Sequence, residues 1–157
     1  MTYTVAPIAF VSATRKSTED DFWGGQMAEI RLADHIDPSS LQGLEAFSHV
    51  EILFLFHAVD PTKLVYGARH PRNNPDWPQV GIFAQRAKGR PNRIGSTICR
   101  VSGVEGGTLK VLELDAIDGT PVLDIKPVMT EFLPRTTVAQ PEWATELMAN
   151  YWADGAP

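Results

Sequence analysis

The stretch from Ile94 to Leu114 limits the possible folds more than any other part of the chain. Two segments rich in aliphatic and β-branched residues, 94–105 and 108–114, are separated by Gly106-Gly107 alone. A two-glycine connection is typical of a tight β-hairpin, because both central positions need positive φ, which glycine adopts without steric cost. The sequence therefore predicts a long antiparallel hairpin within a fold built mainly from sheet.

Further short strands are predicted on both sides of this hairpin, at residues 6–11, 27–32, 49–58, 80–85 and 122–125. The segment 49–58 has a continuous apolar middle, ILFLF, which indicates a central strand buried on both faces. Because side chains alternate along a strand, His57 would share a face with Glu51, Leu53 and Leu55. A structural, hydrogen-bonded histidine and a side chain lining a pocket at the strand's mouth are both compatible with that position.

The remaining elements are short. Leu41, Leu44 and Phe47 repeat every three residues after a possible cap at Ser39 or Ser40, which predicts a helical turn. Residues 141–152 predict one C-terminal helix, with Pro141 in its first turn. Residues 14–26 and 59–79 are expected to be loops. The expected fold is therefore mainly β: a small β-barrel of mostly antiparallel strands with a short C-terminal helix. A single domain is expected over 1–157, with the barrel at about 4–130.

Composition excludes several classes of protein. The single cysteine, Cys99, excludes an internal disulfide and a cysteine-based zinc site, and it fits a reducing, cytoplasmic compartment. The four histidines lack metal-ligand spacing, so no metal is expected. No signal-peptide pattern is visible, and the longest apolar run, 52–56, is too short to span a bilayer. The glycine motifs of nucleotide-binding folds and the HExxH and GxSxG motifs are absent.

Charge is unevenly distributed along the chain. Between Arg69 and Arg100, seven basic residues face a single acid, Asp76, for a net charge of +6, whereas the whole chain carries −5. This basic window is either a solvated charged loop or one face that docks a polyanion while the other faces repel it.

Three carboxylates, Asp115, Asp118 and Asp124, lie close together in the sequence. Aspartates around an Asp-Gly turn usually form the turn itself. Asp124, however, lies in an apolar strand on the same predicted face as Lys126. A buried Asp–Lys pair would be costly to desolvate, which favours a functional site there.

Three segments together resemble the TsaA-like (TrmO-type) family: GLEAFSHVEILFLFH (43–57), GIFAQRAKGRPNRIGSTICRV (81–101) and LDAIDGTPVLDIKP (114–127). Its best-known members are tRNA methyltransferases that use S-adenosylmethionine (SAM) to methylate N6 of threonylcarbamoyladenosine, the modified base beside the anticodon. The family motif usually reads TRSPxRPNPIG, so Gln85 stands for a threonine and Arg93 for a proline. The resemblance implies a non-Rossmann barrel, a homodimer and a tRNA substrate.

The resemblance also implies site residues. Those expected to bind SAM are Trp23, Gly24, His57, Ala58, Arg86, Ser96, Leu112, Glu113, Leu114 and Asp115. Those expected to contact RNA phosphates are Lys88, Arg90 and Arg93. A carboxylate could accept the proton that the adenine nitrogen loses, and the candidate catalytic residues are Asp115, Asp118 and Asp124. Two alternatives stay open: a SAM-dependent methyltransferase of another RNA or a small molecule, and a non-catalytic barrel that binds SAM or adenosine.

Overall fold

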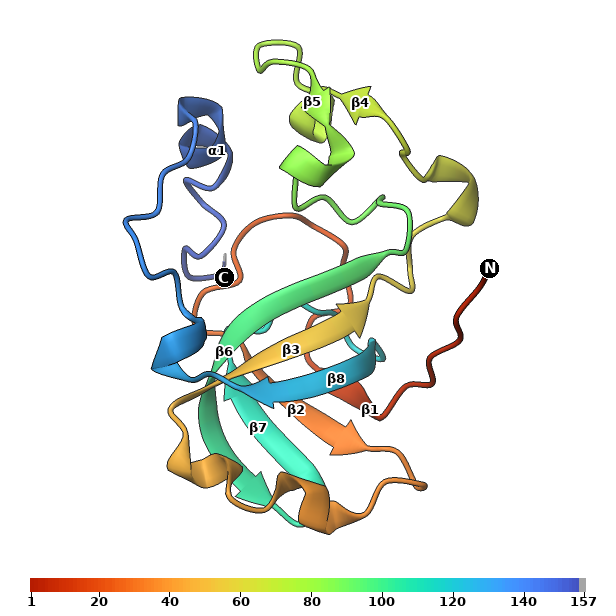
Figure 1. Cartoon of the computed structure of the whole chain (residues 1–157), viewed down its shortest axis with the longest axis vertical. Helices are drawn as coiled ribbons and strands as arrows, with labels where there is room; N and C mark the ends of the chain where they lie inside the picture. The colour runs from red at the N-terminus through yellow and green to blue at the C-terminus, as the bar shows by residue number, and fades with distance from the viewer. Residues whose placement is uncertain (156–157) are drawn as a thin grey trace.

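The computed structural model describes residues 1–155 and contains a closed barrel of antiparallel strands (Figure 1). Around the barrel the strand order is β1-β2-β7-β6-β3-β8. Their bounds are β1 Ala9–Ala13, β2 Met27–Leu32, β3 His49–Leu55, β6 Ile94–Glu105, β7 Thr108–Leu112 and β8 Pro121–Pro127. Every ladder in the barrel is antiparallel. The prediction of a small, mainly β barrel is confirmed.

The core lies inside the barrel and follows from alternation along each strand. On β3, Val50, Ile52 and Phe54 point inward and are at most 1% exposed. The side chains between them, such as Leu53 and Leu55, are only half-buried. The expectation that this strand is buried on both faces is therefore wrong. The barrel is one sheet closed on itself, so its outer face has no second layer to cover it.

The predicted hairpin joins β6 to β7, with Glu105 opposite Thr108. Gly106 has a φ of 57°, but Gly107 does not adopt the left-handed conformation, so only one of the two glycines needs its conformational freedom. The second strand ends at Leu112 rather than at Leu114. Glu113 has a φ of 64°, which breaks the strand and turns Leu114 into the core, where it is 2% exposed.

Residues 59–84 form an excursion beyond one end of the barrel. It contains a two-stranded sheet of β4 (Ala68–Arg69) and β5 (Val80–Gly81) and the short 3₁₀ turns Pro61–Lys63, Pro71–Asn73 and Ile82–Ala84. The sequence predicted a strand over 80–85, which the last of these turns interrupts. Other 3₁₀ turns, Pro38–Leu41, Leu44–Ala46 and Thr130–Phe132, lie in loops. The first is capped by Asp37 rather than by a serine.

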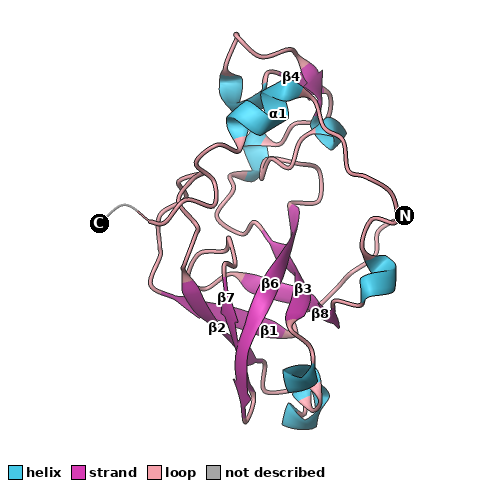
Figure 2. Cartoon of the chain, turned by 90° about the vertical axis from the view of Figure 1, so that its left-hand side faces the viewer, coloured by secondary structure: helices cyan, strands magenta, loops and turns pink. Residues whose placement is uncertain are grey.

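The helix α1 (Glu142–Leu147) lies beside the excursion, at the same end of the barrel in both views (Figures 1 and 2). A hydrogen bond of 2.7 Å from Trp77 Nε1 to Glu146 Oε2 joins the two. The helix is shorter than the predicted 141–152, because the chain turns after Leu147 and residues 150–153 bond to residues 22–24 instead. None of the helices in residues 1–155 has the length and apolarity needed to cross a membrane.

Candidate functional site

A pocket of about 560 Å³ lies on the outer face of the barrel, over β3, β6 and β7. Its position follows from strand register: His49 lies opposite Arg100, and Arg100 lies opposite Leu112. Outward-facing residues at one level of neighbouring strands therefore surround one space. The lining residues are Gly25, His49, Ile98, Arg100, Leu112 and Glu113. Its volume falls within the range typical of small-molecule sites.

The pocket combines apolar walls with a few polar groups. Ile98 and Leu112 supply the apolar surface, and Ile98 is 49% exposed. The Gly25 N–H donates to Glu113 Oε1 at 3.4 Å, which ties the loop before β2 to the end of β7. No hydrogen bond or ion pair within residues 1–155 involves the guanidinium of Arg100, so this cation is available to an anionic group of a ligand.

Two residues along the chain from the pocket-lining Glu113, the carboxylate of Asp115 is held between two hydroxyls. Asp115 Oδ1 accepts a hydrogen bond from Thr97 Oγ1, and its Oδ2 accepts one from the hydroxyl of Tyr151. Burial, together with the charge of Asp115, raises the pKa of Tyr151 well above its ordinary value. Tyr151 therefore remains a protonated donor at neutral pH. We call Thr97, Asp115 and Tyr151 the mouth cluster.

The loop before β2 packs against the C-terminal residues. Trp23 is buried, its indole N–H donates to Asp20 O at 3.1 Å, and the guanidinium of Arg15 lies 3.6 Å from the centre of its ring. A Cβ on Gly24 would lie 2.2 Å from the carbonyl oxygen of Trp152. Only glycine therefore allows this close approach of the two backbones.

Half of the ten residues that the resemblance linked to SAM lie around the pocket and the mouth cluster. Leu112 and Glu113 line the pocket, Asp115 belongs to the mouth cluster, and Trp23 and Gly24 lie in the loop that Gly25 continues. Arg86 donates to the carbonyl oxygen of Ser96 on β6, so its guanidinium already has a partner within the protein.

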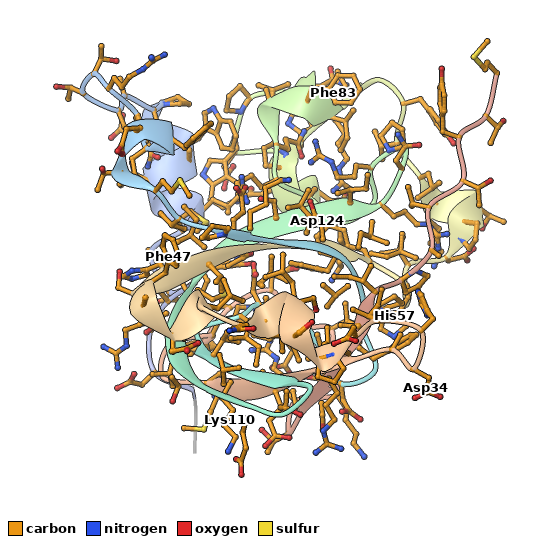
Figure 3. The ribbon with its side chains drawn as sticks, turned by 60° about the horizontal axis from the view of Figure 1, so that its bottom comes forward. Asp34, Phe47, His57, Phe83, Lys110 and Asp124 are labelled. Carbon is orange, nitrogen blue, oxygen red and sulfur yellow. The ribbon has the colours of Figure 1, made fainter. Side chains whose placement is uncertain are left out.

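Leu114 is buried in the barrel core. His57 and Ala58 lie away from the pocket. Both are exposed just past the end of β3, at the edge of the barrel (Figure 3). β3 ends with Leu55 opposite Ile94, whereas the pocket lies at the level of Arg100. Six residues of strand span roughly 20 Å. The structure therefore does not bring His57 into the pocket of its own chain.

The other two carboxylates have partners of their own. Asp118 Oδ1 accepts a hydrogen bond of 3.0 Å from the Ala13 N–H, next to Gly119 at a φ of 79°. Asp118 is thus part of the predicted turn. Asp124 pairs with Lys126 at 2.8 Å, but their side chains are 47% and 60% exposed. The expectation that this pair is buried was wrong, because the outer face of β8 is open to solvent.

The basic window is largely engaged in holding loops together. Lys88 Nζ donates to Thr18 O at 2.7 Å and contacts Asp20 at 3.3 Å. Arg90 Nη1 donates to Gln85 O at 2.7 Å, and Arg93 Nη1 donates to Val59 O at 3.4 Å. These side chains fold the window onto its neighbours, so a contact of Lys88, Arg90 or Arg93 with RNA phosphates would use a cation that already has a partner.

The two departures from the family motif have structural consequences. Gln85 is 7% exposed, and its Nε2 donates to the carbonyl oxygens of Arg69 and Val80, which ties the excursion to the loop after it. Arg93 has a φ of 53°. Proline cannot adopt this conformation, so the chain turns here in a way that the motif's usual residue would not permit.

Sequence reasoning missed several residues of the site. His49, Ile98 and Arg100 could be assigned to a pocket only once the register of β3, β6 and β7 was known. Tyr151 falls within the predicted C-terminal helix over 141–152, and nothing in the sequence links it to Asp115. Within residues 1–155, no group of three histidine, cysteine, aspartate or glutamate side chains lies close enough to hold a metal ion.

The fold defines a class of protein: a closed antiparallel barrel with a pocket on its outer face, unlike the parallel sheets that bind nucleotides at strand ends. The family model described as "tRNA-methyltransferase O N-terminal domain" matches residues 18–132. The chain belongs to this family, as the sequence resemblance predicted. Residues 133–155 lie outside the matched region.

Named relatives share much of the chain. It is 36% identical over 131 residues to a "tRNA (adenine(37)-N6)-methyltransferase" of Escherichia coli, covering 78% of this chain and 55% of that protein. The human protein of the same name is 43% identical over 102 residues, covering 65% of this chain and 23% of that protein. A "Probable S-adenosyl-L-methionine-binding protein" of Methanothermobacter thermautotrophicus is 35% identical over 127 residues, covering 78% of this chain and 88% of that protein.

Among solved structures, that of TrmO from Pseudomonas aeruginosa superimposes with a TM-score of 0.70 at 32% identity, covering 92% of this chain and 63% of that one. The chain therefore spans less than two thirds of the E. coli and human relatives and of this solved structure.

Proposed function

We propose that this protein is a SAM-dependent tRNA methyltransferase that acts on N6 of an adenosine, and that its acceptor is threonylcarbamoyladenosine beside the anticodon. The observation that carries the proposal is the pocket of about 560 Å³, formed within the family-matched region and lined by Leu112 and Glu113. The names of the E. coli and human relatives support the reaction, and that of the archaeal relative supports the methyl donor.

The lining of the pocket suits such a donor. Arg100 has no partner in the described chain and can bind the carboxylate of the donor's amino-acid tail. Ile98 and Leu112 provide apolar surface for a flat ring, and the loop around Gly25 allows backbone groups to approach closely. When bound, SAM supplies a methyl group attached to a positively charged sulfur. A correctly placed nucleophile can take this methyl group, and the sulfur is the leaving group.

Methylation of the acceptor nitrogen also releases a proton, and of the three candidate aspartates Asp115 lies nearest along the chain to the pocket lining. Asp115 lies two residues beyond the pocket-lining Glu113, and within residues 1–155 its two oxygens accept hydrogen bonds only from the hydroxyls of Thr97 and Tyr151. Each oxygen retains a lone pair for a ligand or a proton. Asp118 instead caps a backbone N–H, and Asp124 is paired with Lys126.

The net positive charge of the basic window supports an RNA substrate, even though its side chains Lys88, Arg90 and Arg93 already have hydrogen-bond partners within the protein. We propose that Lys88, Arg90 and Arg93 attract RNA phosphates while they keep their contacts within the protein. Such binding positions a polyanion without reading its sequence, and it weakens as salt increases.

A homodimer would account for His57 and Ala58. At the usual rise per residue of a β-strand, both residues lie roughly 20 Å along the strand from the pocket of their own chain. We propose that they reach the pocket of a second subunit and that the active protein works in the cytoplasm, where tRNA is found. Mixing inactive Arg100→Ala and His57→Ala variants should then restore part of the activity, because mixed dimers contain one intact pocket. No recovery, with mixed dimers present, would contradict a shared site.

The function is tested with the purified protein, SAM and tRNA that carries threonylcarbamoyladenosine without the methyl group. Mass spectrometry of the digested tRNA should show that nucleoside gaining one methyl group. Parallel reactions contain tRNA that lacks the threonylcarbamoyl group, other RNA, or a pool of small metabolites.

The parallel reactions separate the alternatives. Methylation of only another RNA or a metabolite would replace the proposed acceptor, and SAM binding without any transfer would indicate a non-catalytic barrel. Failure to bind SAM at all would refute the proposed function.

A further inference from the structure

The C-terminal residues 142–154, here called the terminal segment, end in a stretch that contacts predicted site residues. Three backbone hydrogen bonds attach them to the loop before β2: Phe22 N–H to Asn150 O at 3.1 Å, Trp23 N–H to Tyr151 O at 2.8 Å, and Gly24 N–H to Ala153 O at 3.1 Å. The family model ends at residue 132, so the terminal segment lies outside the family-matched region.

One side chain of the terminal segment enters the mouth cluster. The ring of Tyr151 packs edge-on against Trp152 at 5.0 Å between ring centres, and its hydroxyl donates to Asp115 Oδ2. The bond to the Trp23 N–H uses the backbone oxygen of Tyr151, so the position of the ring does not depend on the hydroxyl. The backbone contact thus places the ring, and the ring places the hydroxyl.

The carboxylate of Asp115 needs this second donor to be held in one orientation. Thr97 binds only Oδ1, and a single hydrogen bond leaves the carboxylate free to rotate about its side-chain bonds. A donor on each oxygen fixes the plane of the carboxylate and leaves its remaining lone pairs in a defined direction. No ion pair with Asp115 is present within residues 1–155, so these two hydroxyls alone orient its charge.

We propose that Tyr151 is a positioning residue: its hydroxyl holds the Asp115 carboxylate in the orientation that meets the bound methyl donor, so the terminal segment completes the site. This inference rests on the proposed function for the identity of the ligand. The Tyr151–Asp115 contact itself does not, and it can be tested without any ligand.

The first experiment measures SAM binding by titration calorimetry for the whole chain and its Tyr151→Phe variant. The variant keeps the ring and its packing and loses only the hydroxyl. The dissociation constant should rise about tenfold, as expected when a carboxylate loses one hydrogen bond. Tyr66→Phe is the matched control, because Tyr66 is 74% exposed and lies in the excursion. Its dissociation constant should not change.

The second experiment is a double-mutant cycle with Tyr151→Phe and Asp115→Asn, measured both by SAM binding and by denaturant unfolding. If the hydroxyl acts through the carboxylate, Tyr151→Phe should have no further effect on binding in the Asp115→Asn background. Additive effects on binding would overturn the proposal, as would an unchanged dissociation constant for Tyr151→Phe in a folded protein that binds SAM.

A purely structural role predicts a different pattern, in which unfolding midpoints fall while the dissociation constants stay the same. If the unaltered protein does not bind SAM, the proposed function fails. The unfolding cycle still decides the contact: non-additive unfolding energies support it, and additive ones refute it.

Discussion

Replacing Gly24 by alanine should detach the terminal segment and leave the barrel intact. The new Cβ would lie 2.2 Å from the carbonyl oxygen of Trp152 and 2.9 Å from the carbonyl carbon of Ala153. Both atoms belong to the backbone, so no side-chain rotation can relieve the clash. The terminal segment must move, and the three backbone hydrogen bonds between residues 22–24 and 150–153 would be lost.

The size of the effect follows from those bonds. At about 1 kcal/mol net for each hydrogen bond, the free energy that keeps the segment attached should fall by about 3 kcal/mol. Since about 1.4 kcal/mol corresponds to a tenfold change in an equilibrium constant, hydrogen exchange at the Trp23 and Gly24 amides should accelerate roughly a hundredfold. Because Tyr151 would leave Asp115, the dissociation constant for SAM should also rise.

Hydrogen exchange followed by mass spectrometry or NMR provides the assay. The amides of Val50 and Ile52 on β3 are the internal reference and should stay protected. Gly67→Ala is the matched control, because no atom lies within 4 Å of a Cβ built there. Unchanged protection at Trp23 and Gly24 in the Gly24→Ala variant would refute the close approach of the two backbones.

Three further predictions test the barrel and the basic window. Gly95→Ala would place a Cβ 2.6 Å from the ring of the buried Phe54, so denaturant unfolding should show a loss of about 1–3 kcal/mol, and an unchanged midpoint would contradict the packing. Arg93→Pro should lower the free energy of unfolding by about 1–3 kcal/mol because φ is 53° there, although proline is the usual residue of the family motif. Arg93→Gly should be tolerated. Equal stability of the two variants would argue against the left-handed turn. Burial raises the pKa of the Cys99 thiol well above its ordinary value, so iodoacetamide should label Cys99 at pH 8 only after unfolding, and rapid labelling of the native protein would show that the thiol is accessible.

Local sequence pattern was sufficient for the strands that form the barrel. The bounds of β2 and β6 were predicted to the residue, and the turns at Gly106 and Gly119 were placed correctly. Alternation and turn chemistry depend on neighbours in the chain, which a sequence displays directly. The family motifs were also visible, because each is a contiguous run of residues.

Local pattern failed where an outcome depended on distant partners. The apolar run of β3 suggested burial on both faces, but a closed barrel leaves its outer face partly open. The predicted helix over 141–152 ended at Leu147. Beyond it the amides of Tyr151 and Ala153 form only three-residue turns, and the carbonyl oxygens of residues 150, 151 and 153 accept hydrogen bonds from residues 22–24.

By itself, the sequence determined which segments are strands, where they turn, and which family they belong to. Only the tertiary structure decided that Arg100 shares a pocket with Leu112, that His57 lies far from that pocket, and that Tyr151 meets Asp115 across 36 positions of the chain. The reason is physical. Strand formation follows from the preferences of neighbouring residues, whereas a site requires side chains from distant segments to meet. The closure of the barrel and the packing of the terminal segment determine which distant side chains come into contact.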